Sequence, residues 1–242
     1  MEAIKKILSE DTKNCMEATT QNTRQVPKFS ILMNLENLEA MKKYIDSFDF
    51  PEPEPPTQEE INKLTEQKML SCGIPVSKIN ASKKEIRPAK LWTEICKSLQ
   101  ENGSLFLYGA VGCGKSCILS CIAREYVRAG RKTLKYISMY DFALQVSKSL
   151  EDHFNYARLL EDLFSFDVLM LDDIGALGLN ESQKTALIFL LNRVCDQDTQ
   201  LIIASNCDIK DIDSYFDQRI GSRLKEKCAY FKLEGKDRRG RK

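Results

Sequence analysis

The sequence is poor in the features that mark zinc proteins, membrane proteins and secreted proteins. It has one histidine, His153, and none of its nine cysteines forms a Cys-x-x-Cys pair, so a zinc site is not expected. No apolar run approaches the roughly 20 residues that a membrane-spanning helix needs, and the N-terminus lacks the apolar segment of a secretory signal. We therefore expect a cytoplasmic protein with reduced cysteines and no membrane association.

An excess of one charge is also missing. The formal net charge is +1, with 36 basic and 35 acidic residues in a chain of 242. This balance by itself gives no indication of a nucleic-acid partner. The length suits one α/β domain of ordinary size together with a smaller additional region.

What the sequence does contain is a complete phosphate-binding loop. The pattern G-x-x-x-x-G-K-[ST] is matched without a mismatch by Gly109, Ala110, Val111, Gly112, Cys113, Gly114, Lys115 and Ser116. The apolar stretch Leu105–Tyr108 precedes the loop and predicts a strand, while apolar periodicity over 115–129 predicts a helix. A chance glycine turn would not also supply this strand–loop–helix context.

These residue types suit the phosphates of ATP. Glycines have no Cβ and let backbone N–H groups approach closely, and the N-terminus of the helix adds unpaired N–H groups and a positive dipole end. We expect Lys115 to reach the β- and γ-phosphates and the Ser116 hydroxyl to ligate Mg²⁺. Cys117, the next residue, is expected to complete the contacts with the nucleotide.

A proline-rich run marks a boundary near residue 56. Before it, residues 35–48 predict an amphipathic helix whose apolar face carries Leu35, Leu38, Met41, Ile45 and Phe48. The run Pro51–Pro56 cannot continue a helix and favours a stiff, extended linker. We predict a small helical region over 1–56 that binds a partner, with packing of this helix against the following domain as the alternative.

The second region, 57–242, is predicted to be the ATPase domain. Thr57 and Glu60 have the spacing of a capping box, which predicts a helix that ends near Ser71. A further helix is expected over 90–99, with its apolar residues Leu91, Trp92, Ile95 and Leu99 facing inward.

Strands and helices alternate through this domain. Apolar runs predict strands at 105–108, 133–138, 168–171, 201–205 and 229–233. Helices are expected between them at 115–129, 139–150, 154–165 and 181–195. Such alternation requires crossover connections, and strands that are apolar throughout are buried on both faces. The fold class is therefore α/β, with a parallel sheet covered by helices on both faces.

Polar residues follow two of these strands. Asp172 and Asp173 come directly after Val168–Leu171, so Asp172 is expected near the metal and Asp173 beside the attacking water. Asn206 follows the strand at 201–205 and could hydrogen-bond the γ-phosphate or that water. Two solvated acids and an asparagine that turns the chain are the alternatives, and the upstream phosphate loop favours the functional interpretation.

Two groups of basic residues remain. Arg219 and Arg223 lie one helical turn apart in a predicted short helix, and we favour Arg223 as an arginine supplied to the nucleotide of a neighbouring subunit rather than a solvated side chain. The tail contains Arg238 and Arg239 among five basic residues in its last seven. It could contact nucleic-acid phosphates or the nucleotide, or it could be a solubilising end.

The order of these features resembles the AAA+ ATPases, in the branch of DnaC- and DnaI-type helicase loaders and IstB-type transposition helpers. The segments that carry the resemblance are Cys72–Pro75, Gly109–Ser116, Asp167–Gly175, Ala204–Asn206 and Arg219–Arg223. It implies that Asn206 is the sensor-I residue and that Arg223 is the arginine finger, assisted by Arg219. Arg238 or Arg239 would be the arginine that closes over the nucleotide.

The resemblance also implies partners. They are single-stranded DNA, further copies of the chain in a ring or spiral, and the hexameric replicative DNA helicase. The expected function is therefore ATP-dependent loading of that helicase, with a transposition helper on duplex DNA or a nucleotide-gated adaptor without hydrolysis as alternatives. Two departures matter: Asp173 stands where AAA+ enzymes commonly have Glu, which suggests slow hydrolysis, and too little chain follows Leu233 for a full helical lid.

Overall fold

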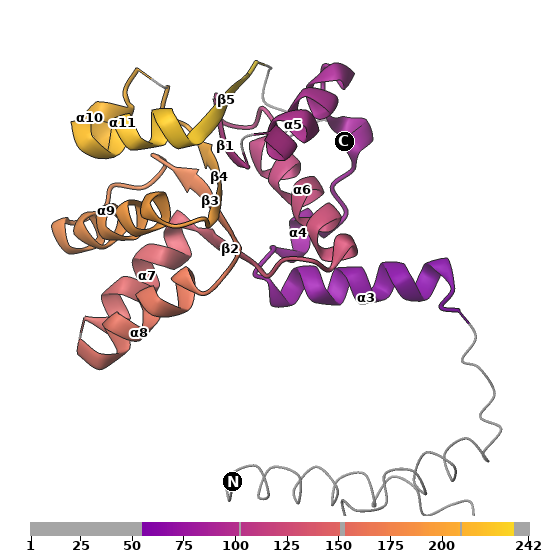
Figure 1. Ribbon diagram of the computed structural model, residues 1–242, viewed down its shortest axis with the longest axis horizontal. Coiled ribbons are helices and arrows are strands. Elements are labelled where there is room, and N and C mark those ends of the chain that lie inside the picture. Colours follow the sequence, from indigo (N-terminus) through magenta and orange to yellow (C-terminus); the bar gives the residue numbers. More distant parts are fainter. Residues whose placement is uncertain (1–54, 102, 151–152, 209, 235–242) are drawn as a thin grey trace, which may run out of the picture. The chain divides into compact units, whose positions relative to one another are not determined.

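A five-stranded sheet forms the centre of the domain (Figure 1). Its strands are β1 (Ser104–Gly109), β2 (Leu134–Ser138), β3 (Val168–Ile174), β4 (Gln200–Ser205) and β5 (Cys228–Leu233). They are all parallel and lie in the order β2-β3-β4-β1-β5. The computed structural model describes residues 55–101, 103–150, 153–208 and 210–234.

Helices connect the strands. They are α3 (Gln58–Ser71), α4 (Val76–Ile79), the 3₁₀ turn η3 (Lys83–Glu85), α5 (Ala89–Glu101), α6 (Lys115–Ala129), α7 (Met139–Ser149), α8 (His153–Phe164), α9 (Glu181–Asp196), α10 (Ile212–Tyr215) and α11 (Gln218–Lys227). Parallel neighbours need such crossovers because a tight turn cannot join them. Among the residues described, no helix is both long and apolar enough to cross a membrane.

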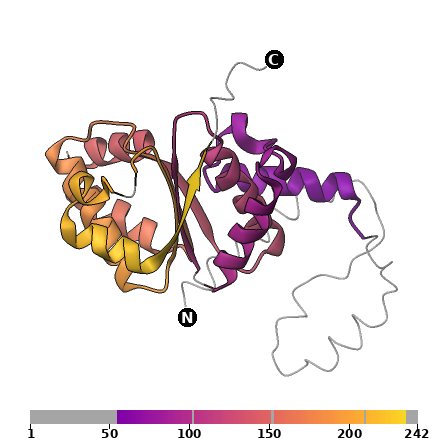
Figure 2. The same ribbon diagram turned by 90° about the horizontal axis from the view of Figure 1, so that it is seen from above.

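The helices cover both faces of the sheet, as Figure 2 shows. On one face α3 to α6 pack against strand side chains such as Leu105, Met170 and Ile202. On the other face α7 to α11 pack against the alternate side chains, which include Phe106 and Leu169. Successive residues of one strand therefore enter two separate apolar cores, which explains why the strands are apolar throughout.

The predicted fold class and the five predicted strands are confirmed. Apolar runs flanked by polar residues were a sufficient signal for these strands because both of their faces are buried. Four strands differ from their predicted bounds by a single residue at one or both ends, but β3 does not end at Leu171 and continues to Ile174, through the two aspartates. The helices predicted after residue 56 are also found, while the short elements α4, η3 and α10 were not predicted.

The start of α3 was predicted by its capping box. The backbone N–H of Glu60 donates to the Thr57 hydroxyl oxygen at 3.3 Å, and the Thr57 N–H donates back to the Glu60 carboxylate at 2.8 Å. Two N–H groups that the first turn of a helix leaves unpaired are thereby satisfied. This local motif depends only on nearby residues, so sequence alone could identify it.

The turn after α3 closes against β2. Tyr136 donates its backbone N–H to the Cys72 carbonyl at 2.8 Å. Gly73 follows with a φ of 97°, and a Cβ at this position would lie 2.4 Å from the Tyr136 carbonyl oxygen. Only glycine fits this close approach, so the segment Cys72–Pro75 has a specific structural role beside the sheet.

Several predictions lie outside the described residues. They concern the helix at 35–48, residues 51–54 of the linker Pro51–Pro56, and the basic tail with Arg238 and Arg239. The division of the chain at residue 56 and the small or absent lid stay predictions for the same reason.

Candidate nucleotide-binding site

The phosphate loop joins β1 to α6 and depends on its glycines. Gly109 ends β1 with a φ of 148°, and a Cβ there would lie 2.3 Å from the Leu233 carbonyl oxygen of β5. Gly114 forms the N-cap of α6 in the left-handed conformation, with a φ of 107°. Both positions exclude larger residues. Because they are glycines, the backbone of the loop lies close to the sheet and stays accessible from the carboxyl edge of the sheet.

The N-terminus of α6 is available to an anion. Gly114 provides no side-chain cap, and the first turn of the helix contains no acidic residue. The first N–H groups of a helix have no partner within the helix and carry its positive dipole end. Because no side chain of the cap occupies this end, the loop fits the phosphates of a nucleotide.

Lys115 lies within the loop as a buried cation. Its side chain is 5% exposed, and its Nζ donates to the carbonyl oxygens of Gly109 at 2.8 Å and Ala110 at 2.9 Å. These neutral oxygens satisfy two of the three ammonium donors without neutralising the charge. A phosphate oxygen would therefore be a stronger partner for Lys115 than its present ones.

Asp172 is held near the carboxyl end of β3 by three hydrogen-bond donors. It is 1% exposed, and its carboxylate accepts the Tyr136 hydroxyl at 2.6 Å and the Asp173 backbone N–H at 2.9 Å. Burial raises the pKa of Asp172 above its ordinary value, while hydrogen bonds from Tyr136 and Ser116 partly oppose this rise. Ser116 and Asp172 thus lie together, and their oxygen atoms are ligands of the kind that Mg²⁺ prefers.

Asp173 has an unusual backbone conformation. Its φ is 60°, the left-handed region, and the pairing of β3 with β4 shifts in register between Leu171 and Ile174. The Asn206 N–H and the Ser205 hydroxyl both donate to the Ile174 carbonyl, at 2.9 and 3.0 Å, and fix the strand beyond the shift. Strain of this kind persists where surrounding structure imposes it, commonly at functional sites.

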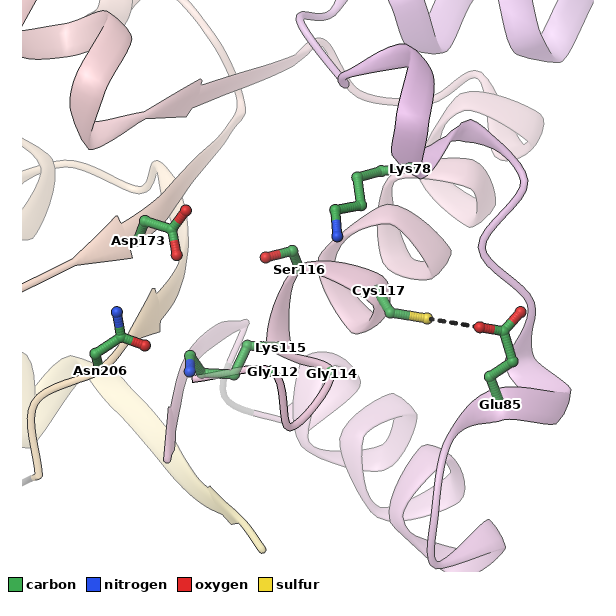
Figure 3. Close-up of a pocket in the computed structure, with 9 residues that line it drawn as sticks. All are labelled: Lys78, Glu85, Gly112, Gly114, Lys115, Ser116, Cys117, Asp173 and Asn206. Atoms are coloured by element: carbon green, nitrogen blue, oxygen red, sulfur yellow. Dashed lines mark hydrogen bonds between the residues drawn. The ribbon is translucent and has the colours of Figure 1, made fainter. Parts of the chain in front are cut away.

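These elements surround a cavity of about 210 Å³, shown in Figure 3. It is lined by Lys78, Glu85, Gly112, Gly114, Lys115, Ser116, Cys117, Asp173 and Asn206. In Figure 3, Asp173 and Asn206 lie on the sheet side of the cavity, and at the start of α6 the Ser116 side chain points toward them while that of Cys117 points toward Glu85. Residues predicted from three separate motifs therefore meet at the carboxyl edge of one parallel sheet.

Sequence reasoning missed two residues of the cavity, Lys78 and Glu85. Lys78 belongs to α4 and Glu85 to η3, the two short elements that were not predicted. Lys78 belongs to no recognisable pattern, whereas Ser82 and Glu85 have the spacing of a capping box, a signal that the sequence analysis did not use. The nearest signal that was used is the Cys72–Pro75 segment, which precedes both and carries part of the resemblance to AAA+ ATPases.

The two predicted arginines of α11 do not line this cavity. Arg223 is 29% exposed by its side chain and forms an ion pair with Asp196 of α9, with 2.7 Å between Nη1 and Oδ1. Arg219 is exposed. An arginine that acts on the nucleotide of a neighbouring subunit would lie away from its own cavity, so their role there stays a prediction.

A model of the bacterial DnaA ATPase domain matches residues 89–229, which is more than half of the chain. The chain belongs to this family. The match includes the phosphate loop, both aspartates, Asn206 and the two arginines of α11. The predicted AAA+ type of ATPase domain is thereby confirmed, while the narrower branch of helicase loaders and transposition helpers is not the one that the match names.

Individual DnaA-family relatives agree with this assignment. The chromosomal replication initiator protein DnaA of Wolbachia sp. subsp. Brugia malayi is 30% identical over 138 residues, which are 56% of this chain and 30% of that protein. The chain thus spans under a third of this curated relative. A solved DnaA bound to AMPPCP and single-stranded DNA matches with a TM-score of 0.55 and 24% identity, over 68% of this chain and 52% of that one.

The fold is also that of a helicase loader. The crystal structure of the DnaC helicase loader matches with a TM-score of 0.56 and 17% identity, over 66% of this chain and 100% of that chain. At this identity the likeness shows a common fold and nothing finer.

Proposed function

We propose that this chain is an ATP-switched AAA+ protein of DNA replication that loads the replicative DNA helicase. The observation that carries the proposal is the cavity in which Lys115, Ser116 and Asp173 meet, with Asn206 beside them. An ammonium, a hydroxyl, a carboxylate and an amide at one helix N-terminus suit the binding and cleavage of a nucleoside triphosphate.

Each residue then has a defined task. Lys115 would exchange its carbonyl partners for the β- and γ-phosphates of ATP, and Ser116 and Asp172 would hold Mg²⁺, which neutralises phosphate charge when bound. Asp173 would orient the attacking water and accept its proton, and Asn206 would donate to the γ-phosphate or to that water.

Two features suit a switch better than a fast motor. Asp173 is one methylene shorter than the Glu usual at this position, and its backbone is in the left-handed conformation. Arg223, proposed as the finger for a neighbour's nucleotide, is engaged with Asp196 in the single chain. Hydrolysis would then be slow until assembly presents Arg223 to another subunit.

The role in replication rests on the relatives. Those matched in sequence are named replication initiators, and one solved DnaA contains single-stranded DNA as well as a nucleotide analogue. We propose a loader because the motifs resemble those of DnaC- and DnaI-type loaders, and the solved DnaC helicase loader has the same fold. The partners proposed are the hexameric helicase, single-stranded DNA and further copies of this chain in a ring or spiral.

A nucleotide-gated adaptor without hydrolysis is the second candidate. The conformation of Asp173 favours it, because a general base must be aligned with the water that it activates. An IstB-type helper on duplex DNA differs from a loader in its DNA and its partner rather than in this site, so the type of DNA in the assay distinguishes the two.

The test is the ATPase rate of the purified protein with no DNA, with single-stranded DNA and with duplex DNA, against Lys115→Ala as the blank. Stimulation by single-stranded DNA, with ATP-dependent co-sedimentation of a hexameric helicase, supports the loader. Stimulation by duplex DNA alone supports the transposition helper. Nucleotide binding without turnover above the blank supports the adaptor, and equal binding by wild type and Lys115→Ala contradicts all three.

A further inference from the structure

Lys78 reaches the nucleotide cavity from outside every motif considered so far. It lies in α4, well upstream of the phosphate loop, yet it lines the same cavity as Ser116 and Asp173. In Figure 3 its side chain runs from α4 toward Ser116, while Lys115 lies on the other side of Ser116, beside Gly112. The cavity therefore has a second ammonium group on its Ser116 side.

The backbone of Lys78 is fastened to the helix that carries the phosphate loop. The Ser120 hydroxyl of α6 donates to the Lys78 carbonyl oxygen at 2.7 Å. Arg124, one turn further along α6, donates to the Ala81 carbonyl at 2.7 Å and to the Ile79 carbonyl. Because Ser116, Ser120 and Arg124 follow one another on consecutive turns of α6, the position of Lys78 is fixed relative to the loop.

The charge of Lys78 has no counter-ion among the residues that the structure describes. Its side chain is half-buried, and no hydrogen bond or ion pair of its ammonium is found there. Glu85 also lines the cavity, but its carboxylate accepts the Ser82 backbone N–H at 3.2 Å and lies 4.0 Å from the Cys117 sulfur. A partly desolvated cation beside the expected metal ligand Ser116 is an electrostatic match for phosphate oxygens.

We propose that Lys78 is a second phosphate-binding residue, which contacts the phosphate chain of the nucleotide on its Ser116 side. The inference rests on the proposed function, because it assumes that the cavity holds a nucleoside triphosphate. It assigns a chemical task to the short helix α4: the helix places one ammonium against the phosphates while α6 holds its backbone.

The experiment compares Lys78→Ala, Lys78→Arg and Lys84→Ala with the wild type. Lys84 is exposed, lies nearby in the chain and does not line the cavity, so it is a matched control for the loss of one positive charge. Affinity for ATP, ADP and AMP is measured by calorimetric titration in the presence of Mg²⁺. Thermal unfolding without nucleotide shows whether each variant is folded.

Lys78→Ala is expected to bind ATP about tenfold more weakly, as the loss of one charge-assisted contact implies. The loss should decrease from ATP to AMP, Lys78→Arg should recover part of it, and Lys84→Ala should change affinity less than about twofold, as an exposed charge would. An equal loss for all three nucleotides, or wild-type affinity in Lys78→Ala, overturns the inference. Lys115→Ala separates the two proposals: if it binds ATP as the wild type does, the proposed function itself fails.

Discussion

The Tyr136 hydroxyl donates a buried hydrogen bond of 2.6 Å to the Asp172 carboxylate. The two residues lie on the neighbouring strands β2 and β3, so a residue of one strand fixes a carboxylate near the carboxyl end of the other. Burial and the nearby Asp172 raise the pKa of Tyr136 well above its ordinary value, so the hydroxyl stays protonated and remains a donor. Tyr136 is thus a positioning residue for the expected Mg²⁺ ligand.

Tyr136→Phe is expected to weaken the dependence of nucleotide binding on Mg²⁺. It removes one donor from a buried carboxylate, which should also lower the free energy of unfolding by about 1–2 kcal/mol. The measurement is nucleotide affinity across a Mg²⁺ titration, with thermal unfolding alongside.

Tyr126→Phe is the matched control for Tyr136→Phe. The Tyr126 hydroxyl donates to the Gln200 side chain at 2.6 Å, away from the cavity. Its loss should reduce stability without changing the Mg²⁺ dependence. If both variants shift the Mg²⁺ titration equally, Tyr136 has no particular role in holding Asp172.

Asp173→Asn is expected to stabilise the protein without nucleotide while removing its hydrolysis. Asparagine tolerates the left-handed conformation, and the change removes the negative charge that lies next to Asp172 and raises its pKa. The loss of a general base should lower turnover by a factor on the order of 100 or more. Thermal unfolding tests the expected gain in stability, and the ATPase rate tests the expected loss of turnover. If Asp173→Asn melts at a lower temperature than the wild type, Asp173 does not strain the folded protein.

Arg223 and Asp196 give a prediction about assembly. Arg223→Ala should lower the ATPase rate at least about tenfold at protein concentrations that allow self-association, because a finger in trans stabilises the transition state. Asp196→Asn should leave the fold intact, since a partly exposed ion pair contributes at most about 1 kcal/mol. By releasing Arg223, it should move the rise in rate to lower protein concentration.

The readout for this pair is the rate as a function of protein concentration, beside the association state from sedimentation. An Arg223→Ala rate equal to that of the wild type in the associated protein would remove the finger role. Arg219→Ala in the same series identifies which arginine of α11 acts.

Asp167 provides a prediction about pH. Its carboxylate accepts the Thr133 backbone N–H at 2.7 Å and the Thr133 hydroxyl at 2.8 Å, and these bonds lower the pKa of Asp167 from its ordinary 3.8. Because the pKa is lower in the folded state, the stabilisation is present above the unfolded value and is lost as pH falls through the folded value. Asp167→Asn should therefore melt below the wild type at neutral pH, and the difference should shrink below about pH 4.

Asp198→Asn serves as the control in this pH series. Asp198 is exposed and accepts no hydrogen bond among those described. Its difference from the wild type should stay flat over the range in which that of Asp167→Asn shrinks. A constant difference for Asp167→Asn would mean that the ionised carboxylate adds nothing to the contact with Thr133.

The sequence was sufficient for the strands, for most helices and for the residues of the phosphate loop. Those features depend on local patterns: an apolar run buried on both faces, a capping box at Thr57, and a glycine-rich loop before a helix. The meeting of Ser116, Asp173 and Asn206 was also predictable, since parallel strands place their carboxyl ends at one edge.

Other parts of the site depend on contacts between distant segments. Lys78 reaches the cavity only because Ser120 and Arg124 hold the backbone around α4, a relationship that no local pattern encodes. The left-handed Asp173 arises from a register shift between β3 and β4, and the bond from Tyr136 to Asp172 from the pairing of β2 with β3. Tertiary pairing decides these details, so a single sequence does not give them.

The contact between Cys72 and Tyr136 has a consequence for how copies of this chain can associate. β2 is an edge strand, and an edge with unpaired N–H and C=O groups can pair with a strand of another molecule. Here the Cys72 carbonyl accepts the Tyr136 N–H, and Gly73 lies close against the Tyr136 carbonyl, so neither backbone group of Tyr136 is open to an incoming strand. The segment after α3 therefore covers the middle of the β2 edge and hinders the addition of a foreign strand, and the aggregation that would follow from it, at that point.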